Sequence, residues 1–531
     1  MRRCRILALL LAGALFASCS YCGKKAPSAE LTRFVPADID AVAVVPDLRI
    51  LADRLGIVSR LKIASFLAGT QGFNSADELI ASLVNQAGVD IRSAEALAKA
   101  GVEPSRGLAV AQWADGSIYL VVAVRDPSLL ERTVAGLART RLGAAVADKK
   151  AEGGLTVTTY STRPGAPPEL GWVVHEGVAL VGAGPAVPRL AAMASLAPER
   201  SLAQDAALAA SLQRLGQPRD FFAYAPATSS IVRSRGLPGV ALVGSLDSSA
   251  FTLRADAPWP NTRGSLQVLD KREGPDLSNV LPSDAFLVAR FQGDPALLGP
   301  YWPHLVGSFI AQAVNSSGFD LQTEVLNNLL PGEVLGVAVA PTAKLGGGVP
   351  ELDVRRTNPF QFIQLVAAAK AKDAQRAQAT LAKLPPVAER FGAHVTPAQR
   401  NGKPVFMTTY LQGEGVHFAL VGDTLVVAAP AAQLDAALGR AASPPHAGPL
   451  PDPALRKALD GRAVSAVIDL HQLAESVKAL PSTAWGLGGF AIKATTVRWL
   501  DATDDLRAVT LGLSEKEGAI EAELSLRLVS K

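Results

Sequence analysis

The chain contains three cysteines, Cys4, Cys19 and Cys22, and all of them lie within its first 22 residues. Cys19 and Cys22 have the C-x-x-C spacing, which suits a thiol–disulfide site or the attachment of a c-type haem. A thioredoxin-like site needs a strand–helix context, and haem attachment needs histidine directly after the second cysteine, where this chain has Gly23. We therefore predict neither redox nor haem chemistry. From residue 23 onward there is no thiol to form a disulfide or to bind a metal.

The segment that precedes Cys19 has the pattern of an export signal. Three arginines within residues 2–5 are followed by an uncharged apolar run, 6–17, which is too short to span about 30 Å of hydrocarbon. Phe16-Ala17-Ser18-Cys19 resembles the bacterial lipobox, although Phe16 stands where leucine is usual, which keeps ordinary cleavage and a soluble periplasmic product as the alternative. The resemblance implies a signal peptide over 1–18, a lipidated Cys19 and a flexible tether over 19–30. We expect a product anchored by lipid in the cell envelope, in the outer membrane facing the periplasm.

Other motifs that could carry chemistry are incomplete. Gly182-Ala-Gly184 lies between a predicted strand and helix, as in a dinucleotide fingerprint, but Val187 takes the place of the third glycine. Ser59-Arg-Leu-Lys62 matches the start of the penicillin-binding serine signature, whose other elements are missing. The histidines show no metal-ligand spacing and are predicted as strand or turn residues: His175, His304, His394, His417, His446 and His471. We predict no enzyme activity, no cofactor and no metal site.

Composition favours large aliphatic cores and gives no footprint for nucleic acid. Of the 531 residues 49% are hydrophobic and only 5% aromatic, and the mean hydropathy is +0.22. The formal net charge of +4 includes three arginines of the predicted signal peptide. Without them the chain has 52 − 3 = 49 basic and 48 acidic residues, a net charge of +1. A nearly neutral chain with no basic run is not typical of a nucleic-acid-binding protein. The length predicts more than one domain.

Landmark sequences recur in the same order in the two halves of the chain. They are the openings at Pro36 and Pro282, Gly-x-Asp at 88–90 and 318–320, Thr-Thr-Tyr at 158–160 and 408–410, Pro-Ala at 185–186 and 430–431, and the helix starts at Asp205 and Asp452. We predict two tandem homologous repeats, 31–272 and 277–531. The second contains an insertion, 342–360, that we expect to protrude as an extended hairpin.

Local patterns predict an α+β fold. The predicted strands are 41–45, 107–113, 118–124, 155–160, 172–175, 178–183, 249–254 and 264–269, with others starting at Phe221 and Val464. Ser75 opens a capping box, and Asp126, Asp294 and Asp452 each precede a proline at the first helical position. Hairpins such as 155–183 are too short for parallel crossovers. Each domain should therefore be a mainly antiparallel sheet packed with helices.

The tandem Pro-Ala-Asp and Pro-Ser-Asp openings behind a lipobox resemble a family of exported bacterial proteins known only as a domain of unknown function. The resemblance brings no catalytic or binding residues with it. Two functional hypotheses remain. One is a non-enzymatic structural or interaction scaffold of the envelope, with an envelope protein as partner. The other is a periplasmic carrier of an apolar or lipid ligand, which a cavity of several hundred Å³ between sheet and helices would favour.

Overall fold

The computed structural model describes residues 28–216, 220–233, 236–259, 266–301, 312, 314–331, 335–341, 363–410, 413–442, 450, 452–479 and 489–529. These residues form two compact units. Unit 1 contains the described residues up to 259 together with 518–521, and unit 2 contains those from 266 to 517 together with 522–529. The division falls close to the boundary expected between the two repeats.

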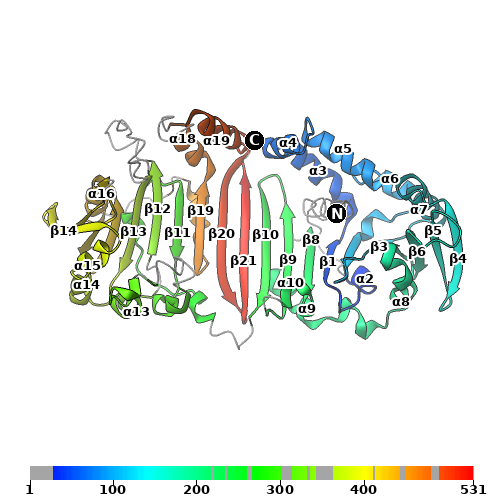
Figure 1. Cartoon of the computed structure of the whole chain (residues 1–531), viewed down its shortest axis with the longest axis horizontal. Helices are drawn as coiled ribbons and strands as arrows, with labels where there is room; N and C mark the ends of the chain where they lie inside the picture. The colour runs from blue at the N-terminus through cyan, green and yellow to red at the C-terminus, as the bar shows by residue number, and fades with distance from the viewer. Residues whose placement is uncertain are drawn as a thin grey trace. The chain divides into compact units, whose positions relative to one another are not determined.

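Unit 1 is built on an antiparallel sheet with the strand order β10–β9–β8–β1–β2–β3–β7–β6–β5–β4 (Figure 1). Its strands are β1 (Ala41–Val45), β2 (Leu108–Gln112), β3 (Ile118–Ala123), β4 (Val146–Glu152), β5 (Leu155–Ser161), β6 (Leu170–His175), β7 (Val178–Ala183), β8 (Phe221–Pro226), β9 (Gly239–Leu246) and β10 (Ala250–Pro258). Antiparallel neighbours that follow each other in the chain, such as β6 and β7, are joined by short turns.

Helices cover both faces of the unit 1 sheet. They are α2 (Ser28–Thr32), α3 (Leu51–Ser59), α4 (Lys62–Thr70), α5 (Ala76–Ala87), α6 (Ala94–Lys99), α7 (Pro127–Leu142), α8 (Leu190–Ala194), α9 (Ala206–Leu215) and α10 (Ser230–Arg233). Val121 belongs to a core with α8 and α9, whereas its neighbour Val122 belongs to a core with α6 and α7. Successive side chains of a strand point to opposite faces. The sheet is therefore packed on both sides.

Unit 2 is also antiparallel, with the order β20–β19–β11–β12–β13–β18–β17–β15–β14 and the short β16 beside β15. Its strands are β11 (Leu287–Phe291), β12 (Leu335–Pro341), β13 (Ile363–Lys370), β14 (Ala393–Arg400), β15 (Lys403–Tyr410), β16 (Gly413–Glu414), β17 (His417–Val421), β18 (Thr424–Ala429), β19 (Val464–Asp469) and β20 (Leu506–Lys516). The last strand, β21 (Ala519–Leu528), contributes its first residues to unit 1.

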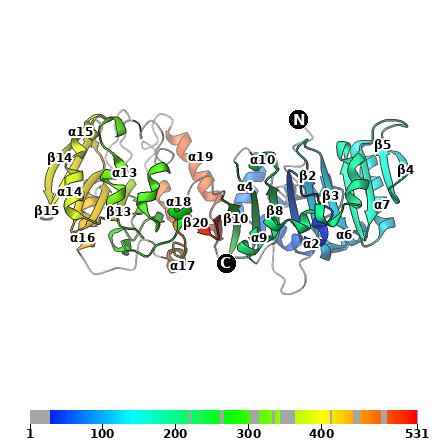
Figure 2. The same ribbon diagram turned by 90° about the horizontal axis from the view of Figure 1, so that it is seen from below.

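The helices of unit 2 lie on both faces of its sheet as well. They are α13 (Leu321–Glu324), α14 (Ala374–Leu381), α15 (Leu384–Glu389), α16 (Ala431–Ala441), α17 (Pro453–Lys457), α18 (Leu470–Ala479) and α19 (Gly489–Ala502). Leu434 of α16 packs in one core with Ala419, and Leu381 of α14 packs in another with Phe418. Figure 2 shows α14 and α16 beside β13 and β15 within this unit.

The strand order of the sheet is the same in the two units. Reading from β9 and from β20, the strands correspond one to one: β9 with β20, β8 with β19, β1 with β11, β2 with β12, β3 with β13, β7 with β18, β6 with β17, β5 with β15 and β4 with β14. That the halves are homologous repeats stays a prediction, which this shared order supports.

The α+β class and the antiparallel pairing are confirmed, and β1 and β7 begin and end at the predicted residues. Ser75 caps α5 by accepting a hydrogen bond from the Glu78 N–H, although the Glu78 carboxylate reaches Asn74 and not Ser75. The predicted strand 264–269 is wrong, because Leu266–Leu269 forms a 3₁₀ turn, in which Val268 is buried and Leu269 packs beside it in the same cluster. The insertion 342–360 lies outside the described residues.

Candidate functional site

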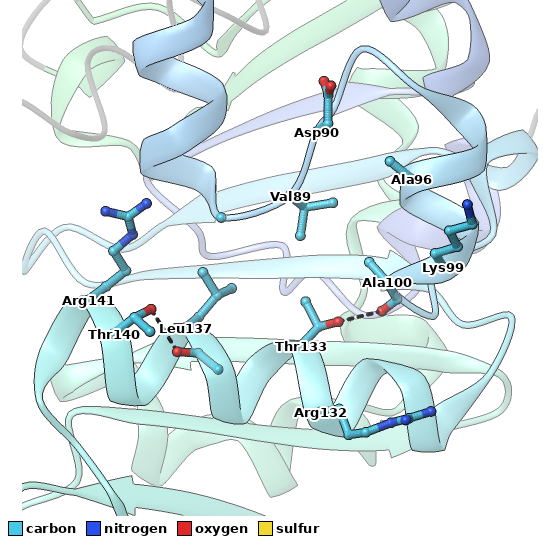
Figure 3. A pocket seen from close by; sticks show the side chains of 12 residues that line it. Val89, Asp90, Ala96, Lys99, Ala100, Arg132, Thr133, Leu137, Thr140 and Arg141 are labelled. Carbon is cyan, nitrogen blue, oxygen red and sulfur yellow. Dashed lines mark hydrogen bonds between the residues drawn. The ribbon is translucent and has the colours of Figure 1, made fainter.

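An open groove in unit 1 is the strongest candidate for a binding site. It lies between α7 on one side and α6 with the 88–90 segment on the other, and its volume is about 700 Å³ (Figure 3). The residues that line it are Gly88, Val89, Asp90, Ala96, Lys99, Ala100, Arg132, Thr133, Gly136, Leu137, Thr140 and Arg141. Half of them come from one face of α7, since positions three and four apart line up along a helix.

Sequence signals at both ends fix α7, the long wall of this groove. The Asp126 carboxylate accepts hydrogen bonds from the N–H groups of Ser128 and Leu129, and Pro127 occupies the first helical position. Gly143 ends the helix in the left-handed conformation, at a φ of 66°. The opposite wall begins where Gly88 ends α5 at a φ of 73°, and a Cβ on Gly88 would lie 2.2 Å from Leu137 Cδ2. A side chain at 88 would therefore displace the Leu137 side chain of α7 and would strain the left-handed backbone at 88.

The groove has an apolar floor and a basic rim. Figure 3 shows Val89 and Leu137 in its middle, with Arg141 at one end and Lys99 at the other. Lys99 forms an exposed ion pair with Glu95 at 2.6 Å. Among the described residues, none forms an ion pair or side-chain hydrogen bond with the guanidinium of Arg132 or Arg141.

The Asp90 carboxylate, which also lines the groove, is bound by Arg92 at 2.9 and 3.0 Å. The hydrogen bond to Arg92 lowers the pKa of Asp90, so this carboxylate is ionised and already has its cation. The rim therefore has a surplus of positive charge that the described part of the chain does not neutralise. An anionic or acidic ligand fits such a rim.

A partly buried hydrogen bond joins the two walls, and unit 2 repeats it. The Thr133 hydroxyl of α7 has two carbonyl acceptors at 3.1 Å, that of Ala100 at the end of α6 and that of Leu129 one turn earlier in α7. In unit 2 the Thr380 hydroxyl of α14 donates to the carbonyl of Glu324, at the end of α13, at 3.1 Å. Each threonine follows its N-cap aspartate by seven residues, from 126 to 133 and from 373 to 380. The helix junction is thus the same in both units.

The two junctions differ in the side chains beside this bond. In unit 2 Lys383 forms an ion pair with the Glu324 carboxylate, and these two side chains occupy the space beside the Thr380 hydrogen bond. In unit 1 the residue ten positions after the cap is Gly136, and the residue that supplies the carbonyl is Ala100. A Cβ added to Gly136 would meet no atom within 4 Å. The groove is therefore open in unit 1 because two small residues stand where unit 2 has an ion pair.

A buried histidine in unit 2 is a second candidate. His417 on β17 is fully buried, and its Nδ1 accepts a hydrogen bond from the Thr408 N–H at 3.0 Å. The neutral ring must therefore carry its proton on Nε2, which lies 3.6 Å from Glu414 Oε2. The Glu414 carboxylate accepts a hydrogen bond from the N–H of Ala431, the first residue of α16, at 2.9 Å.

Burial controls the protonation of this histidine. It lowers the pKa of His417, and the neighbouring Glu414 carboxylate opposes the shift. Neither Nε2 of His417 nor Oγ1 of Thr408 has a hydrogen-bond partner within the part of the chain that the structure describes. The ring is closed to solvent, so no substrate can reach it in this conformation. We interpret the group as a polar connection between β15, β17 and α16.

The structure brings together none of the other motifs considered from the sequence. Cys19 lies outside the described residues. Gly182 lies within β7, the second strand of an antiparallel hairpin, and Gly184 directly follows that strand, which differs from the parallel strand–helix–strand unit of a dinucleotide site. Ser59 Oγ donates to the carbonyl of Gly56 at the end of α3, and Lys62 begins the next helix.

The histidines are scattered. His175 and His394 lie on strands, whereas His471 lies on α18, so its prediction as a strand or turn residue is wrong. His304 and His446 lie outside the described residues. In the described ranges no three His, Cys, Asp or Glu side chains gather as metal ligands, and no helix there is long and apolar enough to cross a membrane.

Comparisons with known proteins leave the chain to be interpreted from its own geometry. No protein-family model matches it, and no curated protein or solved structure matches it significantly.

The sequence interpretation missed the groove, although a signal for it exists. The spacing from Asp126 to Thr133 is repeated from Asp373 to Thr380, and it could have joined the other landmarks of the repeat. Aligning the halves on that spacing places Gly136 opposite Lys383. The alignment alone does not show that an ion pair fills the junction in unit 2 whereas the junction in unit 1 stays open.

Proposed function

We propose that the chain is a lipoprotein of the bacterial cell envelope, anchored through Cys19, and that it acts as a non-enzymatic scaffold that docks a partner in the groove of unit 1. The observation that carries this proposal is the pair of small residues, Gly136 and Ala100, at a junction that unit 2 fills with Lys383 and Glu324. A basic groove with an apolar floor binds a partner without any catalytic group.

The packing of unit 1 favours a scaffold over a carrier of apolar ligands. Leu180 on the sheet and Leu190 on α8 are both completely buried and belong to one cluster that fills the space between strands and helices. A lipid chain bound there would have to displace these side chains, because protein cores are close-packed. The groove lies outside this core, between helices, and it is open to solvent.

The anchor is tested with the substitution Cys19→Ser and the matched control Cys22→Ser. Wild type and C22S should partition into detergent with the mass of an acylated chain that begins at residue 19. C19S should keep its first 18 residues, because the thiol that is acylated has been removed. A mature, membrane-associated C19S protein would contradict the anchor.

Docking is tested in living cells with a photo-crosslinking amino acid at position 140 or, as control, at 139. Thr140 lines the groove, whereas Arg139 is exposed on another face of the same helix. Protein adducts at 140 and not at 139 would support the scaffold. Equal adducts at both positions would contradict it, and adducts to lipid alone would favour the carrier.

A further inference from the structure

We propose that the groove of unit 1 receives an acidic amphipathic helix of a partner protein. The inference rests on the proposed scaffold function and names the chemistry of its partner. Two properties of the groove determine that chemistry: its unneutralised basic rim and the shape of its floor.

The positive charge of the rim favours a partner that carries carboxylates. Arg132 and Arg141 come from the same helix and have no ion-pair partner in the described ranges. The Asp90 carboxylate, which lines the groove, is bound by Arg92. A partner that brings its own carboxylates would complete two ion pairs at rim positions about 14 Å apart along α7, from nine helical rises of 1.5 Å.

Unit 2 shows what the same junction accommodates. There the carbonyl acceptor of the threonine belongs to Glu324, whose carboxylate binds Lys383 and lies 3.4 Å from Thr380 Oγ1. Unit 1 keeps the threonine bond but has Ala100 in place of the glutamate. Neither helix of this junction supplies an acidic side chain at that place in unit 1, and a carboxylate of a partner would fit it.

The shape of the floor favours a helix over a lipid. Val89, Ala96 and Leu137 form an apolar strip that ends at charged residues on both sides, the arrangement that binds one face of an amphipathic helix. Gly136 has no side chain, which allows a close approach along α7. Sites for small apolar ligands usually enclose most of the ligand surface, whereas this groove is open to solvent.

The probe is a designed 14-residue fluorescent peptide that is helical, with leucines on one face and glutamates beside them, titrated by anisotropy against the full chain in nanodiscs of zwitterionic lipid. A peptide with lysine in place of each glutamate is the control. The acidic peptide should bind, and added salt should weaken the binding because the rim pairs are exposed. The basic peptide should bind at least tenfold more weakly.

Two pairs of variants locate the site. Gly136→Leu should fill the groove and weaken binding at least tenfold, whereas Gly56→Leu, at another helical glycine whose Cβ would meet open space, should bind as wild type does. Arg132→Glu should weaken binding about fivefold to tenfold, as expected for reversing one exposed ion pair. Arg139→Glu makes the same change of net charge outside the groove and should have little effect.

The outcomes separate this inference from the function on which it rests. Loss of binding in G136L and R132E, with G56L and R139E unchanged, supports an acidic helix. Equal affinity for both peptides, or wild-type binding by G136L, overturns the inference. Binding of anionic phosphatidylglycerol vesicles that depends on Gly136, without binding of the peptide, assigns the groove to lipid and also overturns it. A failure of the anchor shows separately, in the fractionation of C19S, and leaves the peptide result intact.

Discussion

Replacing Asp256 by alanine should destabilise unit 1 strongly, because it removes the buried carboxylate that forms an ion pair with a nearly buried arginine. Asp256 on β10 is fully buried, and its two oxygens accept hydrogen bonds from Nε and Nη2 of Arg214 on α9, each at 2.8 Å. The Arg214 side chain is only 11% exposed, so water cannot replace the lost carboxylate. Breaking a buried pair in this way costs about 3–5 kcal/mol. For a domain of this size that corresponds to a fall of roughly 6–20 °C in melting temperature.

The assay is calorimetry of the full chain in detergent, with hydrogen exchange to locate the loss of stability. Amides of α9 and β10 should lose protection first in D256A. A double variant, Arg214→Met with Asp256→Leu, removes both charges and should recover most of the lost stability, since the penalty arises from removing one partner of a buried ion pair and keeping the other. Glu131→Gln breaks an exposed pair with Lys149 in the same unit and should leave the melting temperature unchanged within error.

Two results would refute this reasoning. A D256A protein as stable as wild type would show that the pair contributes nothing, and a double variant as unstable as D256A would show that packing, and not the unpaired charge, causes the loss. The comparison with E131Q excludes a general effect of removing one negative charge from unit 1.

Two further predictions concern the buried polar contacts. Because burial lowers the pKa of His417 below its ordinary 6.5, the folded chain binds a proton less readily than the unfolded chain, so the urea midpoint of unit 2 should fall as the pH drops from 7.5 to 5.5. In His417→Phe this dependence should be weaker, and an identical pH profile would contradict the assignment. Thr133→Val and Thr380→Val each remove the hydroxyl that donates to a partly buried carbonyl between two helices, and each should cost about 1 kcal/mol in urea unfolding. A loss confined to one unit would show that the two junctions are not equivalent.

The sequence predicts the fold well wherever the periodicity of a strand reflects its burial. β1 and β7 are continuous runs of small aliphatic residues, most of them buried, and their limits follow from composition. β4 was missed because it reads Val-Ala-Asp-Lys-Lys-Ala-Glu and six of its seven residues are exposed. A strand with no buried face has no hydrophobic alternation to read, and it forms because β5 supplies a full ladder of partners.

The groove is harder to predict from the sequence than the fold, because it depends on the absence of a side chain at Gly136. In the sequence Gly136 only weakens a helix, by about 1 kcal/mol relative to alanine. Its role becomes apparent only when α6 is placed against α7, because Gly136 then lines a groove together with Arg132 and Arg141. His417 was likewise predicted as an ordinary strand residue, and only the fold brings Thr408 and Glu414 to its two ring nitrogens.

The backbone of α7 does not require a glycine at position 136. Gly136 lies within a regular helix and not at a positive φ, and no neighbouring atom would obstruct a Cβ, so the backbone does not require it. Gly56 meets the same two conditions, which shows that such a glycine is not by itself a sign of function. What distinguishes Gly136 is its place beside Thr133, at a junction that unit 2 closes with Lys383. A larger residue would strengthen α7 and fill the groove, and a docking partner is a physical reason for the groove to stay open.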